Sequence, residues 1–157
     1  MTTNEPLAYF LTWRTYGTWL PGDKRGWVTD QTNVFGQPMH RADHRRMAEA
    51  EGLLDGPPVV LDDSQRRVVD AAIRQACSAR GWKMGALNVR TNHVHVVVGS
   101  SDSLPSRVMT YLKARSTKAL ADAGHPTPRP WARAGSHRIV WNETALAAVV
   151  NYVLNRQ

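Results

Sequence analysis

The segment WKMGALNVRTNHVHVVVG, residues 82–99, decides the fold of this chain. Residues 82–91 and 93–99 each have the composition of a β-strand, and little more than Thr91 and Asn92 separates them. Two strands so close in sequence are expected to pair as a β-hairpin. The rest of the fold depends on what flanks this hairpin in the sequence.

A helix is expected on each side of the hairpin. In residues 62–81, Asp62 or Asp63 can cap the start, apolar residues recur at helical spacing, and a glycine ends the segment. Residues 103–124 offer Ser103 as a candidate cap and also end at a glycine. The expected elements are strand 7–17, helix 62–81, strands 82–91 and 93–99, helix 103–124, strand 137–141 and a last helix that Asn142 caps and that runs to residue 157. Residues 30–58 and 125–136 are expected to be connections, with a short helix around 44–54.

The order strand–helix–strand–strand–helix–strand predicts an α+β protein with a ferredoxin-like split β-α-β core. Such a core has a four-stranded antiparallel sheet with two helices on one face. The other face stays open for a ligand or for the added C-terminal helix. A length of 157 residues suits one domain spanning residues 1–157.

The charge of the chain favours a polyanionic partner. Twenty Lys and Arg residues against 13 Asp and Glu residues give a net charge of +7, and six tryptophans accompany them. Basic residues interleaved with aromatic ones are typical of proteins that bind nucleic acids, single strands especially. The alternative is that the charge is solvated surface and the tryptophans are core.

Membrane and disulfide chemistry are not expected. The longest apolar stretches are far too short to span a bilayer, and the first residues lack the pattern of a signal peptide. A single cysteine, Cys77, excludes an internal disulfide. We therefore expect a cytoplasmic protein without a membrane partner.

His93 and His95 form the most unusual motif of the sequence, because a packed strand has no need of imidazoles. Side chains two apart on a strand point to the same face, so both rings can bind one metal ion while they are neutral. A closed zinc site is disfavoured, since no second cluster of His or Cys completes a tetrahedral set. An open, catalytic ion fits the pair better. The alternative is a solvated pair on an exposed sheet face.

The motif NHVHVVV resembles the His-hydrophobe-His motif of the HUH endonucleases. Three more segments, TWRTYGTWLPGDKRGWV, YLKARSTKAL and WARAGSHRIVWNETALAAVVNYVLNRQ, are similar to the REP-associated tyrosine transposases, relatives of the single-tyrosine transposases of small insertion sequences. The resemblance extends from Tyr9 to Gln157. It implies a ferredoxin-like core whose C-terminal helix carries the catalytic tyrosine.

The resemblance also implies a mechanism. Tyr152 matches the family's nucleophile, and His93 and His95 match its metal ligands for Mg²⁺ or Mn²⁺. The activity implied is that of a single-stranded DNA endonuclease and strand transferase, acting through a 5′-phosphotyrosine intermediate at hairpin-flanked DNA. The alternatives are a catalytically inactive relative that binds hairpin DNA, and, for Tyr152 alone, a core aromatic on an amphipathic helix.

The third metal ligand departs from the family pattern. Relatives often place a glutamine four residues after the tyrosine, and this position is Arg156 here. We expect Gln157 to be the third ligand, with Asn155 as the alternative. The chain is expected to act as a monomer or as a homodimer.

Basic and aromatic residues from three regions are expected to bind the DNA. Those at the end of the first strand are candidates for base stacking or base-edge contacts, and the others for phosphate contacts. The DNA-binding candidates are Arg14, Tyr16, Trp19, Lys113, Arg115, Lys118, Arg133 and Arg138.

Overall fold

The computed structural model describes residues 5–29, 31, 37–99 and 102–155. Within this part of the chain, an antiparallel sheet of four strands has the order β2-β3-β1-β4. Its strands are β1 (Ala8–Thr15), β2 (Met84–Val89), β3 (His93–Gly99) and β4 (Trp131–Val140). The helices are α1 (His44–Gly52), α2 (Asp63–Arg80), α3 (Pro105–Asp122) and α4 (Glu143–Asn155). The predicted α+β class, with its ferredoxin-like order, antiparallel sheet and added C-terminal helix, is confirmed.

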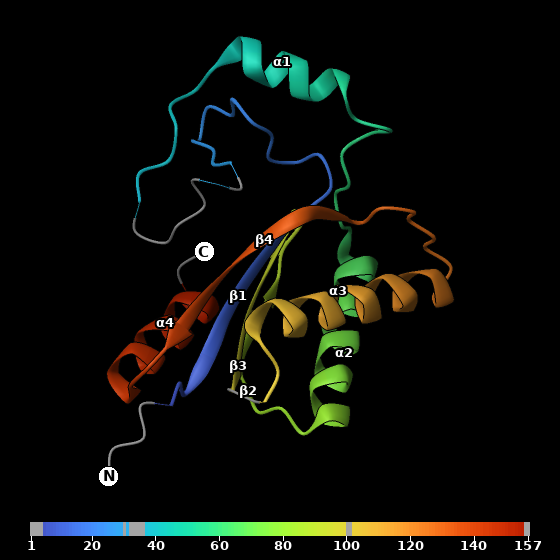
Figure 1. Cartoon of the computed structure of the whole chain (residues 1–157). Helices are drawn as coiled ribbons and strands as arrows, with labels where there is room; N and C mark the ends of the chain where they lie inside the picture. The colour runs from blue at the N-terminus through green and yellow to red at the C-terminus, as the bar shows by residue number, and fades with distance from the viewer. Residues whose placement is uncertain (1–4, 30, 32–36, 100–101, 156–157) are drawn as a thin grey trace.

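The sheet separates two hydrophobic layers. Helices α2 and α3 cover one face, and α4 lies on the other (Figure 1). Alternate residues of the central strands, such as Leu11, Trp13, Val94 and Val96, are fully buried under α2 and α3. The valine-rich strand β3 is therefore buried on both faces for most of its length, which explains why it lacks a simple polar and apolar alternation.

Helix α4 covers the second face with a smaller apolar cluster. Val149 and Val153, one helical turn apart, pack with Val97 of β3 and Ala86 of β2. The same cluster includes Ala8 and Val140. Its small size matters for function, because it fixes α4 while leaving part of this sheet face to polar side chains.

Most of the predicted helix ends are confirmed. The Asp62 side chain accepts a hydrogen bond from the Gln65 backbone N–H, and the Gln65 side chain accepts one from the Asp62 N–H, which completes a capping box. Gly81 ends α2 with a left-handed φ of 70°. The Asn142 side chain accepts a hydrogen bond from the Ala145 N–H at the start of α4. The expectation for Ser103 is wrong: the N-cap of α3 is Leu104, and no side chain caps this helix.

Strand β4 is longer than the sequence indicates. We expected a strand over residues 137–141 after a loop, but β4 begins at Trp131. Trp131 is buried and packs edge-on against Trp13, with ring centroids 6.0 Å apart. At Gly135 the strand runs directly beneath Met109 of α3. The absence of a side chain at Gly135 allows this close approach, so the glycine serves packing here and does not mark a loop.

The connection between β1 and α2, residues 16–61, rises above one end of the sheet and carries α1 (Figure 1). Helix α1 contains no buried residue. A backbone hydrogen bond from Asp43 N–H to Gly22 C=O and a bridge between Trp27 and His40 hold the connection together. We refer to it below as the β1–α2 connection. In the part of the chain described here, no helix combines the length and apolar character needed to cross a bilayer.

Cys77 offers a direct test of the core. It is the only cysteine of the chain, is buried under the sheet on α2, and burial raises the pKa of its thiol to about 11. At pH 8 the thiolate population is on the order of 100-fold below that of an exposed thiol. We expect Ellman's reagent to label the folded protein far more slowly than the denatured protein, and equal rates would contradict this packing.

Gly135→Ala tests the approach of α3 to β4. A Cβ at this position would meet Met109 and would lie 2.8 Å from the Thr12 carbonyl oxygen. We expect a loss of roughly 1–3 kcal/mol in the free energy of unfolding, measured by urea denaturation. Gly52→Ala is the matched control, because no atom lies within 4 Å of its added Cβ. Equal stabilities of the two variants would contradict the close approach.

Candidate active site

The two histidines of β3 lie on the sheet face that α4 partly covers. His95 is opposite Thr12 of β1 in the strand register, and His93 is opposite Arg14. The two imidazole rings meet edge-on with centroids 4.7 Å apart. The prediction that both rings share one face is confirmed.

Each imidazole is oriented by a hydrogen bond at Nδ1. His93 Nδ1 lies 2.7 Å from Asn92 Oδ1, and His95 Nδ1 lies 2.7 Å from Thr12 Oγ1. Because an amide oxygen only accepts hydrogen bonds, His93 Nδ1 carries a proton, and in the neutral ring Nε2 carries the lone pair. A Thr12 hydroxyl can either donate or accept, and in the tautomer in which it accepts from His95 Nδ1–H the Nε2 lone pair of His95 is left for a ligand. Such oxygen partners are typical of metal-binding histidines.

The environment keeps His95 neutral. Burial, with further contributions from His93, Arg14 and Arg90, lowers the pKa of His95 to about 3. Only 8% of its surface is exposed, so a charged imidazolium would lose most of its hydration. A neutral imidazole is the form that binds a metal ion, so His95 is in the form that fits a divalent cation.

Tyr152 of α4 lies beside this pair. Its ring centroid is 5.8 Å from that of His95 and 6.2 Å from that of Phe10, while Phe10 and His95 are 5.4 Å apart. Tyr152 is 44% exposed, whereas its neighbours Val149 and Val153 fill the apolar cluster. The alternative of a core aromatic does not describe Tyr152. The helix presents its phenol at the surface, next to the imidazoles.

A hydrogen bond ties the end of α4 to the edge strand β2. Asn88 is opposite His95 in the register of β2 and β3, and its Nδ2–H donates to the Val153 carbonyl oxygen at 3.0 Å. Val153 directly follows Tyr152, and the last carbonyls of a helix need partners from outside. Asn88 thus links the tyrosine helix to the histidine strand.

The expected third metal ligand is not placed. Gln157 lies outside the described residues. Asn155 is exposed on the last turn of α4, and its Nδ2 donates to Asn151 Oδ1 at 2.9 Å. Within the described ranges, no cluster of three or more His, Cys, Asp or Glu side chains gathers as a metal site. The candidate ligands that the structure describes are therefore the two imidazoles and Asn155.

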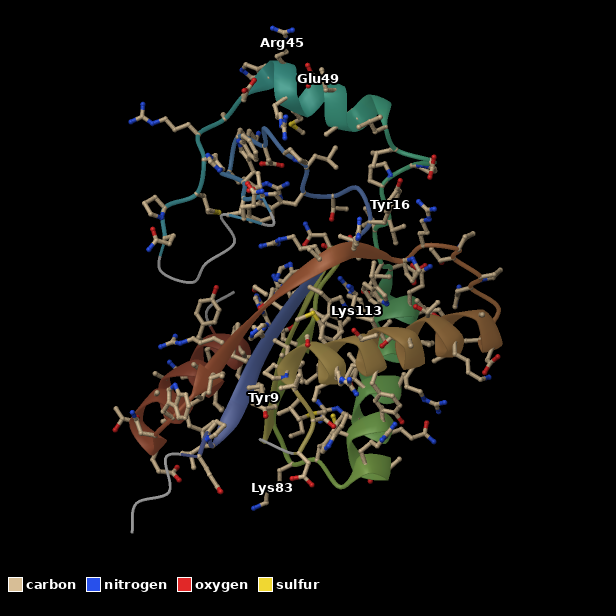
Figure 2. The ribbon with its side chains drawn as sticks, viewed as in Figure 1. Tyr9, Tyr16, Arg45, Glu49, Lys83 and Lys113 are labelled. Carbon is tan, nitrogen blue, oxygen red and sulfur yellow. The ribbon has the colours of Figure 1, made fainter. Side chains whose placement is uncertain are left out.

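The candidates at the end of β1 gather around Trp19. The Arg14 guanidinium carbon lies 3.6 Å from the Trp19 ring centroid, and that of Arg25 lies 4.0 Å from it. Tyr16 instead points to the β1–α2 connection, where its hydroxyl accepts a hydrogen bond from the Asp55 N–H (Figure 2). Arg14 is the member of this group that faces the histidines.

The candidates on α3 lie across the sheet from the histidines. The Lys113 ammonium donates to the Ala132 carbonyl oxygen of β4 at 2.9 Å, and burial lowers its pKa (Figure 2). Lys118 forms an ion pair with Asp122 at 2.8 Å, and Arg115 is exposed. The structure does not bring these three residues to the side of the sheet that carries the histidine pair.

The expected basic patch on β4 is divided between the two faces. Arg138 is opposite Phe10, whose ring packs on the α4 side, whereas His137 is opposite Leu11, which is buried on the α3 side. Arg133 is exposed, and it lies where the register between β1 and β4 shifts, so alternation does not assign it to a face. Arg138 is therefore the residue of this set that the register places on the face of the histidines.

Three polar residues of the site were missed by the sequence analysis: Thr12, Asn88 and Asn92. Each is polar within or beside an apolar strand. The alternation of Phe10, Thr12 and Arg14 on β1 already contained the information that Thr12 faces away from the core. The strand pairing needed to place it beside His95 was not available from sequence.

Two solved structures have a similar fold. The structure of a REP-associated tyrosine transposase bound to a REP hairpin matches with a TM-score of 0.54 and 13% identity, covering 98% of this chain and 68% of that chain. The crystal structure of a Deinococcus radiodurans protein described as a candidate transposase matches with a TM-score of 0.53 and 17% identity, covering 100% and 98%. At such identities the likeness shows the fold. No curated protein matches the chain significantly.

The family is shown by a sequence model. Residues 58–153, well over half of the chain, match the model of the IS200-like transposases. The chain belongs to this family, whose members are enzymes that act on DNA. Residues 1–57, with β1 and most of the β1–α2 connection, lie outside the matched range.

Asn88→Ala tests the link between β2 and α4. Removing the hydrogen bond to Val153 is expected to loosen the last turn of α4 by about 1 kcal/mol. Amide hydrogen exchange in residues 151–155 is then expected to rise several-fold, while exchange in α2 stays unchanged. Unaltered exchange at the end of α4 would show that Asn88 does not hold it.

Proposed function

We propose that this transposase is a metal-dependent single-stranded DNA endonuclease and strand transferase with Tyr152 as its nucleophile, and that it acts on hairpin-flanked DNA. The observation that supports this most directly is the 5.8 Å separation of the Tyr152 and His95 rings. A phenol and two imidazoles, far apart in sequence, lie together on the α4 side of the sheet. This is the set of groups that phosphoryl transfer to a tyrosine requires.

The proposed cleavage exchanges one ester for another. The Tyr152 oxygen forms a bond to phosphorus as the bond to the 3′ oxygen breaks, and the DNA is left with a 5′-phosphotyrosine link and a free 3′-hydroxyl. The phenolic proton leaves the tyrosine, and the departing 3′ oxygen takes up a proton. A second 3′-hydroxyl reverses the step and rejoins the strands. No external energy source is needed, because the ester bond is conserved throughout.

Members of this family generally need a divalent metal ion. We assign His93 and His95 as ligands of Mg²⁺ or Mn²⁺, with Gln157 as the third ligand and Asn155 as the alternative. Such an ion supplies charge neutralisation at the phosphate and assistance to the leaving oxygen. Thr12 and Asn92 hold the imidazoles in the orientation that presents Nε2.

The proposed DNA partner is a single strand next to a hairpin. One matched protein is described as bound to a REP hairpin, and the basic, aromatic composition of this chain supports a similar ligand. We assign Arg14 and Arg138 to contacts near the cleaved phosphate, and Tyr16 and Trp19 remain candidates for base stacking or base-edge contacts. Lys113, Arg115, Lys118 and Arg133 remain candidates for a second contact surface on the α3 side. The enzyme acts as a monomer or as a homodimer.

The central test is a covalent-adduct assay. A labelled pool of oligonucleotides with a fixed hairpin and randomised single-stranded arms is incubated with the protein and Mg²⁺ or Mn²⁺, then resolved on a denaturing gel. We expect an adduct that requires the metal and is lost in Tyr152→Phe. The double variant His93→Ala/His95→Ala is expected to form no adduct while its affinity for the hairpin pool stays within about threefold, because phosphate contacts dominate affinity.

The same assay separates the main alternative, an inactive relative that binds hairpin DNA. Tight binding without any adduct would support that function and contradict the proposed one. An adduct that persists in Tyr152→Phe would show that another residue is the nucleophile. Single Gln157→Ala and Asn155→Ala variants distinguish the two candidate ligands, since only loss of the true ligand raises the Mn²⁺ concentration required for cleavage.

A further inference from the structure

Two arginines lie on Trp19, and only one of them is neutralised. Arg25 donates to Asp23 through Nε at 2.8 Å and Nη2 at 2.5 Å, and to the Thr18 carbonyl oxygen at 2.7 Å. Asp23 is buried, with 3% of its surface exposed, and the hydrogen bonds from Arg25 lower the pKa of its carboxyl. The charge of Arg25 is thus matched within the β1–α2 connection.

Arg14 differs from Arg25 in its contacts with the described residues. None of these residues accepts a hydrogen bond from the Arg14 guanidinium or forms an ion pair with it, and Asp23 acts on its charge only from beyond ion-pair distance. The side chain is half-buried, and burial, with Arg25 as a further cause, lowers its pKa to about 10. A partly desolvated cation without a partner is costly unless an anion completes it.

The position of Arg14 indicates which anion. Arg14 is opposite His93 in the strand register and shares the sheet face of the histidine pair. It is close enough to His95 to contribute to the lowered pKa of that imidazole, and close enough to Tyr152 for that residue to raise the pKa of Arg14. The group that has to come near all three side chains in the proposed reaction is the phosphate that is cut.

Trp19 holds the guanidinium in place. Its indole Nε1–H donates to the Gly26 carbonyl oxygen at 2.6 Å, which fixes the ring against the β1–α2 connection. The Arg14 guanidinium carbon lies over this ring, 3.6 Å from its centroid. Such a cation–π contact restricts the side chain without using its N–H donors. The chain thus orients Arg14 before any DNA is present.

We propose that Arg14 is a catalytic residue that binds a non-bridging oxygen of the scissile phosphate, and that Trp19 and Arg25 are its positioning residues. This inference rests on the proposed function. It gives a role to the β1–α2 connection, most of which lies outside residues 58–153, the part of the chain that matches the family model. Negative charge on the phosphate grows as Tyr152 attacks, and a preorganised guanidinium stabilises it without reorganisation.

The first experiment uses phosphate binding alone. The dinucleotide thymidylyl-3′,5′-thymidine is titrated into the labelled protein at constant ionic strength while arginine Nε–H resonances are followed by NMR, with Arg14→Lys identifying the Arg14 signal. We expect a saturable shift of Arg14 and no shift of Arg67, which is exposed on α2. An unmoved Arg14 resonance would overturn the inference.

The second experiment measures adduct formation with an oligonucleotide that the wild-type enzyme cleaves. Arg14→Ala is expected to lower the rate at saturating DNA by about 100-fold, as loss of a preorganised donor does, with little change in DNA affinity. Arg14→Lys is expected to retain part of the rate. Added guanidinium ion is expected to rescue Arg14→Ala but not Tyr152→Phe, and Arg67→Ala is expected to behave as wild type.

The outcomes separate this inference from the proposed function. A wild-type protein that forms no adduct contradicts the proposed function, whatever the NMR titration shows. The role of Arg14 is overturned if the wild type is active and Arg14→Ala is equally fast. It is also overturned if neither Arg14→Lys nor added guanidinium ion relieves the defect of Arg14→Ala.

Trp19→Leu tests the positioning role of Trp19. We expect it to slow cleavage about tenfold, because Trp19 acts by orienting Arg14. Added guanidinium ion is still expected to rescue Arg14→Ala when Trp19→Leu is also present. A Trp19→Leu rate equal to that of the wild type would overturn the positioning role.

Discussion

The site depends on the alternation of side chains along β1 and β3, the two central strands. On β3, Val94 and Val96 are fully buried under α2 and α3, while His93 and His95 point to the opposite face. A shift of one residue in the pairing would move the valines to the surface and the imidazoles into hydrocarbon. The free energy of burying the valines therefore fixes the register, and the register in turn places Thr12 beside His95 and Arg14 beside His93.

The second constraint is the attachment of α4, which decides where the phenol lies. Val149 and Val153 are the buried residues by which α4 packs on Val97, with Ala145, Leu146 and Val150 packed beside them. Tyr152 lies outside this apolar stripe and faces outward. Asn88 adds a directional hydrogen bond at the same turn, which a purely apolar contact lacks. Packing sets the distance of the helix from the sheet, and the hydrogen bond sets its position along β2.

Much of the fold could be predicted because its elements are defined locally. The Asp62 capping box, Gly81 and the spacing of His93 and His95 need no tertiary information, and neither does their common face. Strand β4 was predicted too short because Ala132, Ala134 and Gly135 have little intrinsic preference for a strand. They adopt one because β1 offers a free edge and Met109 requires a position without a side chain. In the same way, the environment of Thr12 exists only once β1 and β3 are paired.

The arginine stack on Trp19 shows the limit of composition as evidence. Trp19 and Arg25 were counted among basic and aromatic residues that indicate nucleic acid, and the structure gives them a more specific arrangement. Asp23 forms an ion pair with Arg25, whereas Arg14 forms none with any residue that the structure describes. The polar β1–α2 connection thus holds the positive charge of Arg14 beside two imidazoles and a phenol. The number of arginines matters less here than which of them has a carboxylate partner.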